Sequence, residues 1–111
     1  MDEKILKYSH DALQAMGKIT RFVEGKTFEE YNKDDFLCSA VERQFEILGE
    51  ALNNIKKMDE EIFNSIEGSR DAISFRNILA HGYDTVDNVV VWGIIEKDLS
   101  KLKHSIEKLM E

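Results

Sequence analysis

The sequence predicts an all-α protein, an up-and-down four-helix bundle with one short additional helix. The chain has 111 residues without a proline, 42% of them are hydrophobic, and its apolar side chains recur at three- and four-residue steps. This periodicity places apolar residues on one face of a helix, and such helices bury that face against each other. The length suits a single domain over residues 1–111.

The first helix is predicted from an apolar stripe that ends before Gly25, a residue type common just past a helix end. Its members follow helical spacing: Ile5, Leu6, Ala12, Leu13, Met16, Ile19, Phe22 and Val23. Thr27 and Glu30 then match a capping box, in which two side chains satisfy free amides at a helix start. A short helical turn is expected there.

Asp34 or Asp35 can cap a second long helix. One continuous stripe supports this helix: Leu37, Ala40, Val41, Gln44, Ile47, Leu48, Ala51, Leu52 and Ile55. Asp59 is then placed to cap a short helix over residues 60–66.

Gly68 and Ser69 break the chain before a helix over residues 70–81, which Gly82 ends. Asp84 or Asp87 can cap the last helix, which is predicted as one continuous segment. Its apolar positions form a seam like that of a coiled coil: Trp92, Ile95, Leu99, Leu102, Ile106 and Leu109.

Composition and charge indicate where the protein is located and what it binds. No apolar run approaches the roughly 20 residues that span a bilayer, and Met1–Lys4 does not resemble a signal peptide. Cys38 is the single cysteine, so no internal disulfide can form, which favours a location in the reducing cytoplasm. Its thiol is expected to be buried as a small hydrophobic group. The formal net charge of −7 argues against broad binding along nucleic acid, although residues 69–83 are locally net positive.

The candidate functional segment runs from Arg76 through Asn77 to His81 and Tyr83. On a regular helix, Arg76 and His81 lie roughly 140° apart in azimuth and about 7.5 Å apart along the axis. His81 falls in the last turn, where the helix dipole favours imidazolium, and Arg76 offers a fork suited to phosphate oxygens. In a purely structural alternative, Arg76 forms a salt bridge, His81 caps carbonyls and Tyr83 buries its ring.

Arg76, His81 and Tyr83, with four residues and then one residue between them, resemble the signature of HepT-like HEPN toxins. Residues 40–51 are similar to the second helix of that family, and residues 83–92 are similar to the segment after its motif. The resemblance implies a homodimer in which two motifs face each other, and a metal-independent endoribonuclease without a cofactor. It also implies that Arg76 and His81 are catalytic, and Asn77 is expected to orient His81 or a phosphate.

The same resemblance implies a type II toxin–antitoxin module. In that family a nucleotidyltransferase antitoxin can transfer AMP from ATP to the motif tyrosine, which corresponds to Tyr83, and AMPylation there would compete with RNA. Two alternatives remain: a non-catalytic module that binds a nucleotide or docks a nucleotidyltransferase, and a plain helical scaffold.

The remaining polar and aromatic candidates are expected to have structural rather than catalytic roles. Glu42, Glu46 and Glu50 share one helix face, which is interpreted as solvated rather than metal-binding, and Glu50 and Arg43 are a candidate buried pair. His10 and His104 are expected at the surface and Trp92 in the core.

Overall fold

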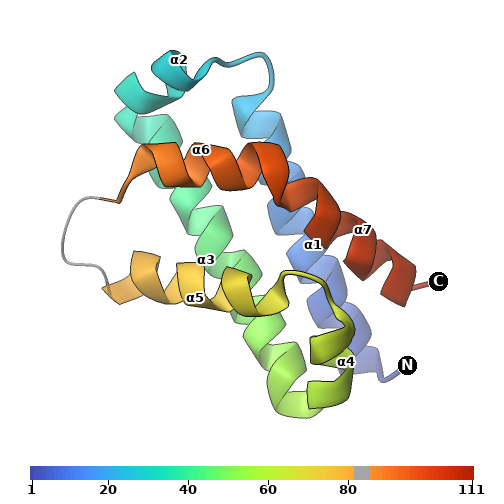
Figure 1. The fold of residues 1–111 in the computed structure, drawn as a ribbon. Helices are drawn as coiled ribbons and strands as arrows, with labels where there is room; N and C mark the ends of the chain where they lie inside the picture. The colour runs from blue at the N-terminus through green and yellow to red at the C-terminus, as the bar shows by residue number, and fades with distance from the viewer. Residues whose placement is uncertain (82–85) are drawn as a thin grey trace.

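The structure is a computed structural model that describes residues 1–81 and 86–111. Within these residues the chain forms seven helices (Figure 1). The all-α class is confirmed. The helices are α1 (Glu3–Val23), α2 (Phe28–Lys33), α3 (Asp35–Met58), α4 (Glu60–Ser65), α5 (Ser69–His81), α6 (Asn88–Lys97) and α7 (Leu99–Leu109). None of these described helices is long and apolar enough to cross a membrane.

Helices α2, α3, α4 and α6 begin with the side-chain caps that the sequence predicts. The Asp34 carboxylate accepts from the Leu37 amide at 3.0 Å, so Asp34 rather than Asp35 caps α3. Asp59 and Asp87 cap α4 and α6 in the same way, and Thr27 forms the predicted capping box at α2. Each cap satisfies an amide that has no partner inside its helix.

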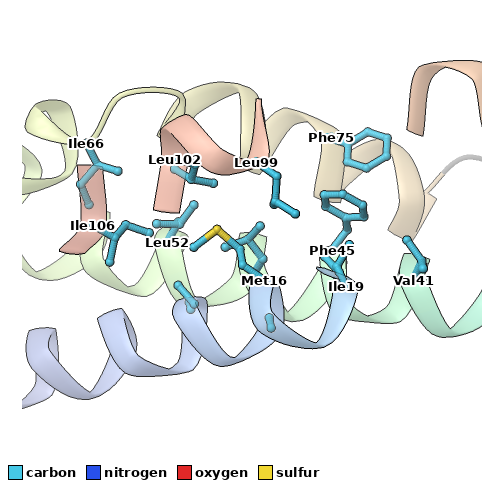
Figure 2. Packing of buried hydrophobic residues seen from close by; sticks show 14 of the residues in the cluster. Met16, Ile19, Val41, Phe45, Leu52, Ile66, Phe75, Leu99, Leu102 and Ile106 are labelled. Carbon is cyan, nitrogen blue, oxygen red and sulfur yellow. The ribbon is translucent and has the colours of Figure 1, made fainter. Parts of the chain in front are cut away.

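The long helices α1 and α3 lie side by side in opposite directions, and α5 and α6 cross this pair obliquely (Figure 1). Their stripes meet in one core, in which Met16, Leu52 and Ile106 are almost wholly buried (Figure 2). Phe45 of α3 and Phe75 of α5 pack edge to face, with ring centroids 5.1 Å apart. This aromatic pair joins the motif-bearing helix to the core.

The last predicted helix differs from the structure, which divides it into α6 and α7 at Asp98. Helix α6 packs on α2, where Trp92 contacts Tyr31, whereas α7 packs on α1 through residues such as Ile106. The two halves therefore face different partners, and the chain bends between them. The structure also has two short helices, α2 and α4, where the fold prediction allowed one.

Cys38 lies in the core, as expected, whereas Trp92 is only partly buried and packs against the core. Cys38 is buried, and its thiol donates to the Tyr31 carbonyl oxygen at 3.2 Å. Burial raises the pKa of this thiol, which disfavours the reactive thiolate. The half-buried Trp92 ring packs 5.3 Å from the Tyr31 ring. His10 and His104 are exposed, as predicted.

Candidate active site

Helix α5 carries Arg76, Asn77 and His81, and His81 is its last residue, in agreement with the predicted helix end. The backbone of His81 is described, but its side chain lies outside the described part of the chain. Tyr83 also lies outside the described residues, which resume at Val86. Arg76 and Asn77 are therefore the motif residues whose side-chain contacts the structure describes.

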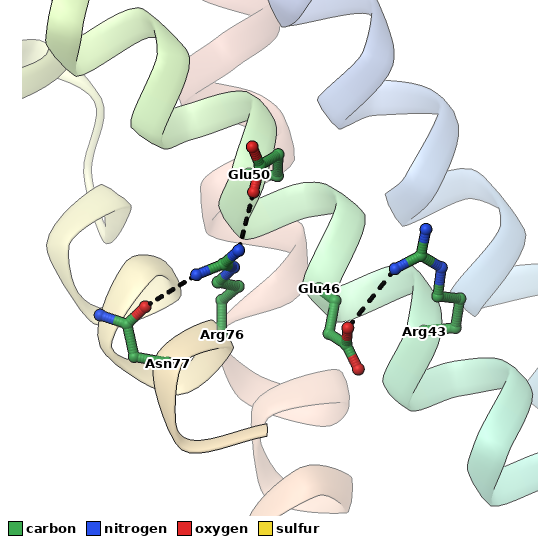
Figure 3. A network of polar contacts seen from close by, with 5 residues as sticks. All are labelled: Arg43, Glu46, Glu50, Arg76 and Asn77. Carbon is green, nitrogen blue, oxygen red and sulfur yellow. Dashed lines mark hydrogen bonds and ion pairs between the residues drawn. The ribbon is translucent and has the colours of Figure 1, made fainter. Parts of the chain in front are cut away.

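The Arg76 guanidinium is held at both terminal nitrogens (Figure 3). Nη2 donates to Glu50 Oε2 at 2.8 Å, and Nη1 donates to Asn77 Oδ1 at 3.2 Å. The arginine side chain is 30% exposed, so part of it remains accessible to solvent. Two partners fix the plane of the guanidinium, which prepares it to meet phosphate oxygens without reorganisation. The contact with Glu50 is also the salt bridge that the purely structural alternative expects of Arg76.

Glu50 has a different partner from the one expected. The sequence suggested a buried pair with Arg43, but Arg43 Nη1 pairs with Glu46 Oε2 at 3.4 Å, and Glu50 is 54% exposed. The prediction was wrong because helical neighbours lie three or four positions apart, whereas Glu50 follows Arg43 by seven positions. Glu50 is instead turned toward α5, where it meets Arg76.

Gly49 allows this arrangement and was missed as a site residue. A Cβ at position 49 would overlap Arg76 Cβ, and it would lie 2.7 Å from Arg76 Cγ and 3.2 Å from the Ala72 carbonyl oxygen. Only glycine thus permits α3 and α5 to approach so closely. The available signal was a glycine inside an unbroken helical stripe, which costs about 1 kcal/mol and calls for a packing reason.

The structure also tests the predicted solvated face of α3 and the net positive stretch over residues 69–83. Glu42 is partly buried, and burial together with the neighbouring Glu46 carboxylate raises its pKa. The predicted solvated face is therefore solvated only in part. Arg70 does not join Arg76: its guanidinium donates to Asn64 Oδ1 at 2.8 Å and lies over the Phe63 ring. The net positive stretch predicted for residues 69–83 is thus not one cationic surface.

Among the hollows that the described residues form, one reaches Arg76. A groove of about 290 Å³ lies along α1 and α3, and Arg76 and Glu50 line one part of it. A second hollow of about 220 Å³ lies among α3, α5, α6 and α7, with the Phe45 and Phe75 rings in its wall. Arg76 is not among the residues that line the second hollow.

Comparisons with known proteins agree over most of the chain. The family model described as "Ribonuclease HepT-like" matches residues 12–109. A Thermococcus cleftensis protein named "Probable ribonuclease HepT" is 33% identical over 102 residues, which cover 92% of this chain and 92% of that protein. A Methanocaldococcus jannaschii protein named as a candidate RNase is 28% identical over 100 residues, covering 90% of this chain and 91% of that protein.

A second Methanocaldococcus jannaschii protein is named as a gamma-glutamylcyclotransferase and candidate RNase. It is 33% identical over 111 residues, which are 100% of this chain but only 50% of that protein, so the chain spans half the length of this relative. No solved structure matches the chain. The family match covers α3 and α5, which carry Arg76, Glu50 and His81. The chain therefore belongs to the HepT-like ribonuclease family, as the resemblance of residues 76–83 predicted.

Proposed function

We propose that this HepT-like ribonuclease is the toxin of a type II toxin–antitoxin module and cuts RNA internally through Arg76 and His81. The observation that carries the proposal is the preorganised Arg76 guanidinium, held by Glu50 and Asn77 at the edge of a groove. His81 ends the same helix five positions later. Family membership supplies the reaction class, and Arg76 supplies a phosphate ligand at a defined place.

His81 acts in proton transfer at the ribose 2′-hydroxyl or at the leaving oxygen. The 2′-oxygen attacks phosphorus as it loses its proton, the bond from phosphorus to the 5′-oxygen breaks, and that oxygen takes up a proton. The products are a 2′,3′-cyclic phosphate and a 5′-hydroxyl. Arg76 stabilises the negative charge that gathers on the phosphate oxygens, and Asn77 keeps Arg76 oriented.

The proposed enzyme is a homodimer formed by a single-domain chain. Ile78 lies on α5 three positions before His81 and thus on the same side of the helix as that residue, and this large apolar side chain is 58% exposed. An apolar side chain beside the motif is suited to a two-fold contact, in which the same surface of each copy meets the other. Two motifs brought together in this way would form a deeper cleft than one helix offers.

The proposed antitoxin is a nucleotidyltransferase that transfers AMP from ATP to the Tyr83 hydroxyl and releases pyrophosphate. Only four residues separate Ser69–His81, the helix that carries the motif, from Val86, and Tyr83 is one of them. An adenylate at Tyr83 would bring a phosphate and a bulky nucleoside near the end of α5. Both would compete with RNA for the cationic site.

The test compares the purified protein with His81→Ala on total RNA and defined transfer RNAs, with chelator present. We expect metal-independent cutting with cyclic phosphate ends, and a loss of at least about 10²-fold in the variant. His104→Ala removes an exposed imidazole from α7 and serves as the matched control. Equal cutting by the wild type and His81→Ala would reject this site.

The second candidate function is a non-catalytic module that docks a nucleotidyltransferase or binds a nucleotide. One observation favours it: Glu50 already neutralises Arg76 in a chain whose net charge is −7. Absence of cutting by the wild type, together with binding of a nucleotide or a nucleotidyltransferase, would support this function.

A further inference from the structure

The groove between α1 and α3 extends beyond Arg76 and presents mostly hydrogen-bonding side chains. Figure 3 shows Arg43, Glu46 and Glu50 on successive turns of α3, with Arg76 of α5 reaching Glu50. Helix α1 supplies the opposite wall, where Lys18 lines the groove. The groove thus continues from the proposed site of cleavage along the surface between α1 and α3.

Three cations from three helices line this groove: Lys18 of α1, Arg43 of α3 and Arg76 of α5. Within the described residues, Lys18 makes no ion pair. The pair between Arg43 and Glu46 is long, at 3.4 Å, and the arginine side chain is 67% exposed. Exposed pairs of this kind contribute at most about 1 kcal/mol, so a phosphate can readily replace the carboxylate at Arg43.

The groove carries cations and carboxylates in equal number. Its three cations are balanced by the carboxylates of Asp11, Glu46 and Glu50. Formal neutrality is still more favourable to a phosphate than the remainder of a chain with a net charge of −7. The volume of about 290 Å³ is at the lower end for ligand pockets, which excludes a duplex from the groove.

The uncharged part of the wall suits an unpaired base. Tyr8 is half-buried and lines the groove, and the amides of Gln14, Gln44 and Asn54 lie along it. Amide groups both donate and accept, as the edges of bases require, and aromatic rings stack on bases that are not paired. A phosphate ligand, an aromatic ring and amides in one small groove together fit a nucleotide.

We infer that this groove binds one unpaired nucleotide of the RNA next to the scissile phosphate. Lys18 and Arg43 contact its phosphate, and Tyr8 and the amides contact its base. The inference rests on the proposed function in one respect, namely that Arg76 marks the scissile phosphate. It restricts cleavage to single-stranded segments, because a paired base cannot enter the groove.

The test uses a fluorescein-labelled single-stranded RNA of mixed sequence and the double variant Lys18→Ala/Arg43→Ala. Both side chains are exposed, so the variant is expected to fold, and its thermal denaturation is compared with that of the wild type. Lys57→Ala/Lys103→Ala removes the same charge from exposed positions outside the groove and is the matched control.

We expect KM for the RNA to rise about tenfold or more in the groove variant while kcat is unchanged. The slope of log(kcat/KM) against log[salt] should become shallower by roughly 0.7, since Lys18 and Arg43 contact the same phosphate and each phosphate contact on a single strand contributes about 0.7. Tyr8→Leu should raise KM without changing this slope. The control variant should match the wild type in both quantities.

An unchanged KM and an unchanged salt slope in the groove variant would overturn the inference, and loss of cutting in His81→Ala would then still support the proposed function. If the wild type does not cut RNA, fluorescence anisotropy with the same RNA decides. A lower affinity in the groove variant than in its control would support the groove, and equal affinities would overturn it.

Discussion

Among the individual residues of the site, the neighbours of Arg76 determine how its guanidinium is oriented. An exposed arginine would adopt many rotamers, and ordering it on binding RNA would oppose binding through lost entropy. Here Glu50 and Asn77 hold both terminal nitrogens before any substrate arrives. The same contacts lower the charge that Arg76 offers to RNA. Orientation is thus gained at the expense of electrostatic attraction.

The residue-scale prediction concerns Glu42. Burial and the Glu46 carboxylate raise the pKa of Glu42 above its ordinary value of 4.5. The folded state therefore binds this proton more tightly than the unfolded chain. The resulting stability is fully present below pH 4.5 and is lost as the pH rises through the raised pKa. We expect Glu42→Gln to have a higher Tm than the wild type at pH 7.

The gain in Tm should shrink toward zero near pH 4, because Glu42 of the folded wild type is then protonated and resembles glutamine. Thermal denaturation followed by circular dichroism across this pH range measures the difference. Glu61→Gln removes the same charge from an exposed position of α4 and should give no such pH-dependent gain. A Tm difference for Glu42→Gln that stays constant with pH would contradict this assignment.

At the scale of elements, α3 is the support on which the motif helix is positioned. Helix α5 packs mainly on α3, through the edge-to-face pair of Phe45 and Phe75 and through the close approach at Gly49. The aromatic pair provides apolar burial, and the glycine determines how near the two axes lie. Together they decide where Arg76 stands relative to the groove.

The element-scale prediction is that Gly49→Ala separates α3 from α5. The added methyl group collides with Arg76 Cβ, and overpacking of this kind typically costs about 1–3 kcal/mol in the free energy of unfolding. Displacement of the guanidinium by about 1 Å should reduce kcat/KM on the order of 10²-fold. Chemical denaturation and RNA cleavage measure the two effects.

Gly17→Ala is the matched control for this prediction. Gly17 lies in α1, where an added Cβ would meet Arg21 Nη1 at 3.9 Å, an ordinary contact. Alanine is the better helix former, so this variant should be more stable than the wild type by about 0.5–1 kcal/mol. If Gly49→Ala were stabilising to the same extent, the close approach of the helices would have no role in positioning Arg76.

At the scale of the whole molecule, the dimer is what would convert a shallow motif surface into a cleft. Ile78 is exposed on the motif helix, whereas Leu6 is exposed on α1. In sedimentation at micromolar concentration we expect the wild type and Leu6→Glu to be dimers and Ile78→Glu to dissociate. Two glutamates facing each other across a two-fold axis repel and remain poorly hydrated. A stable wild-type monomer would contradict the proposed dimer.

Much of the fold was predictable from local signals. Caps at Thr27, Asp34, Asp59 and Asp87 and the spacing of apolar residues are short-range features, and the helix starts that they predicted are present. The bend at Asp98 was not predictable in this way. It arises because α6 and α7 pack on different helices, and a coiled-coil-like seam in the sequence does not reveal such a change of partner.

The helical class, the helix starts and the presence of Arg76 and His81 on one helix follow from the sequence alone, because they depend on periodicity, capping and spacing within a few residues. The packing of the helices is needed to know that Glu50 rather than another acid holds Arg76, that Gly49 lets α5 approach α3, and that Lys18 and Arg43 share a groove with Arg76. These relations join residues that lie 25 to 58 positions apart in the sequence. Side-chain packing between helices, which no local pattern encodes, brings them together.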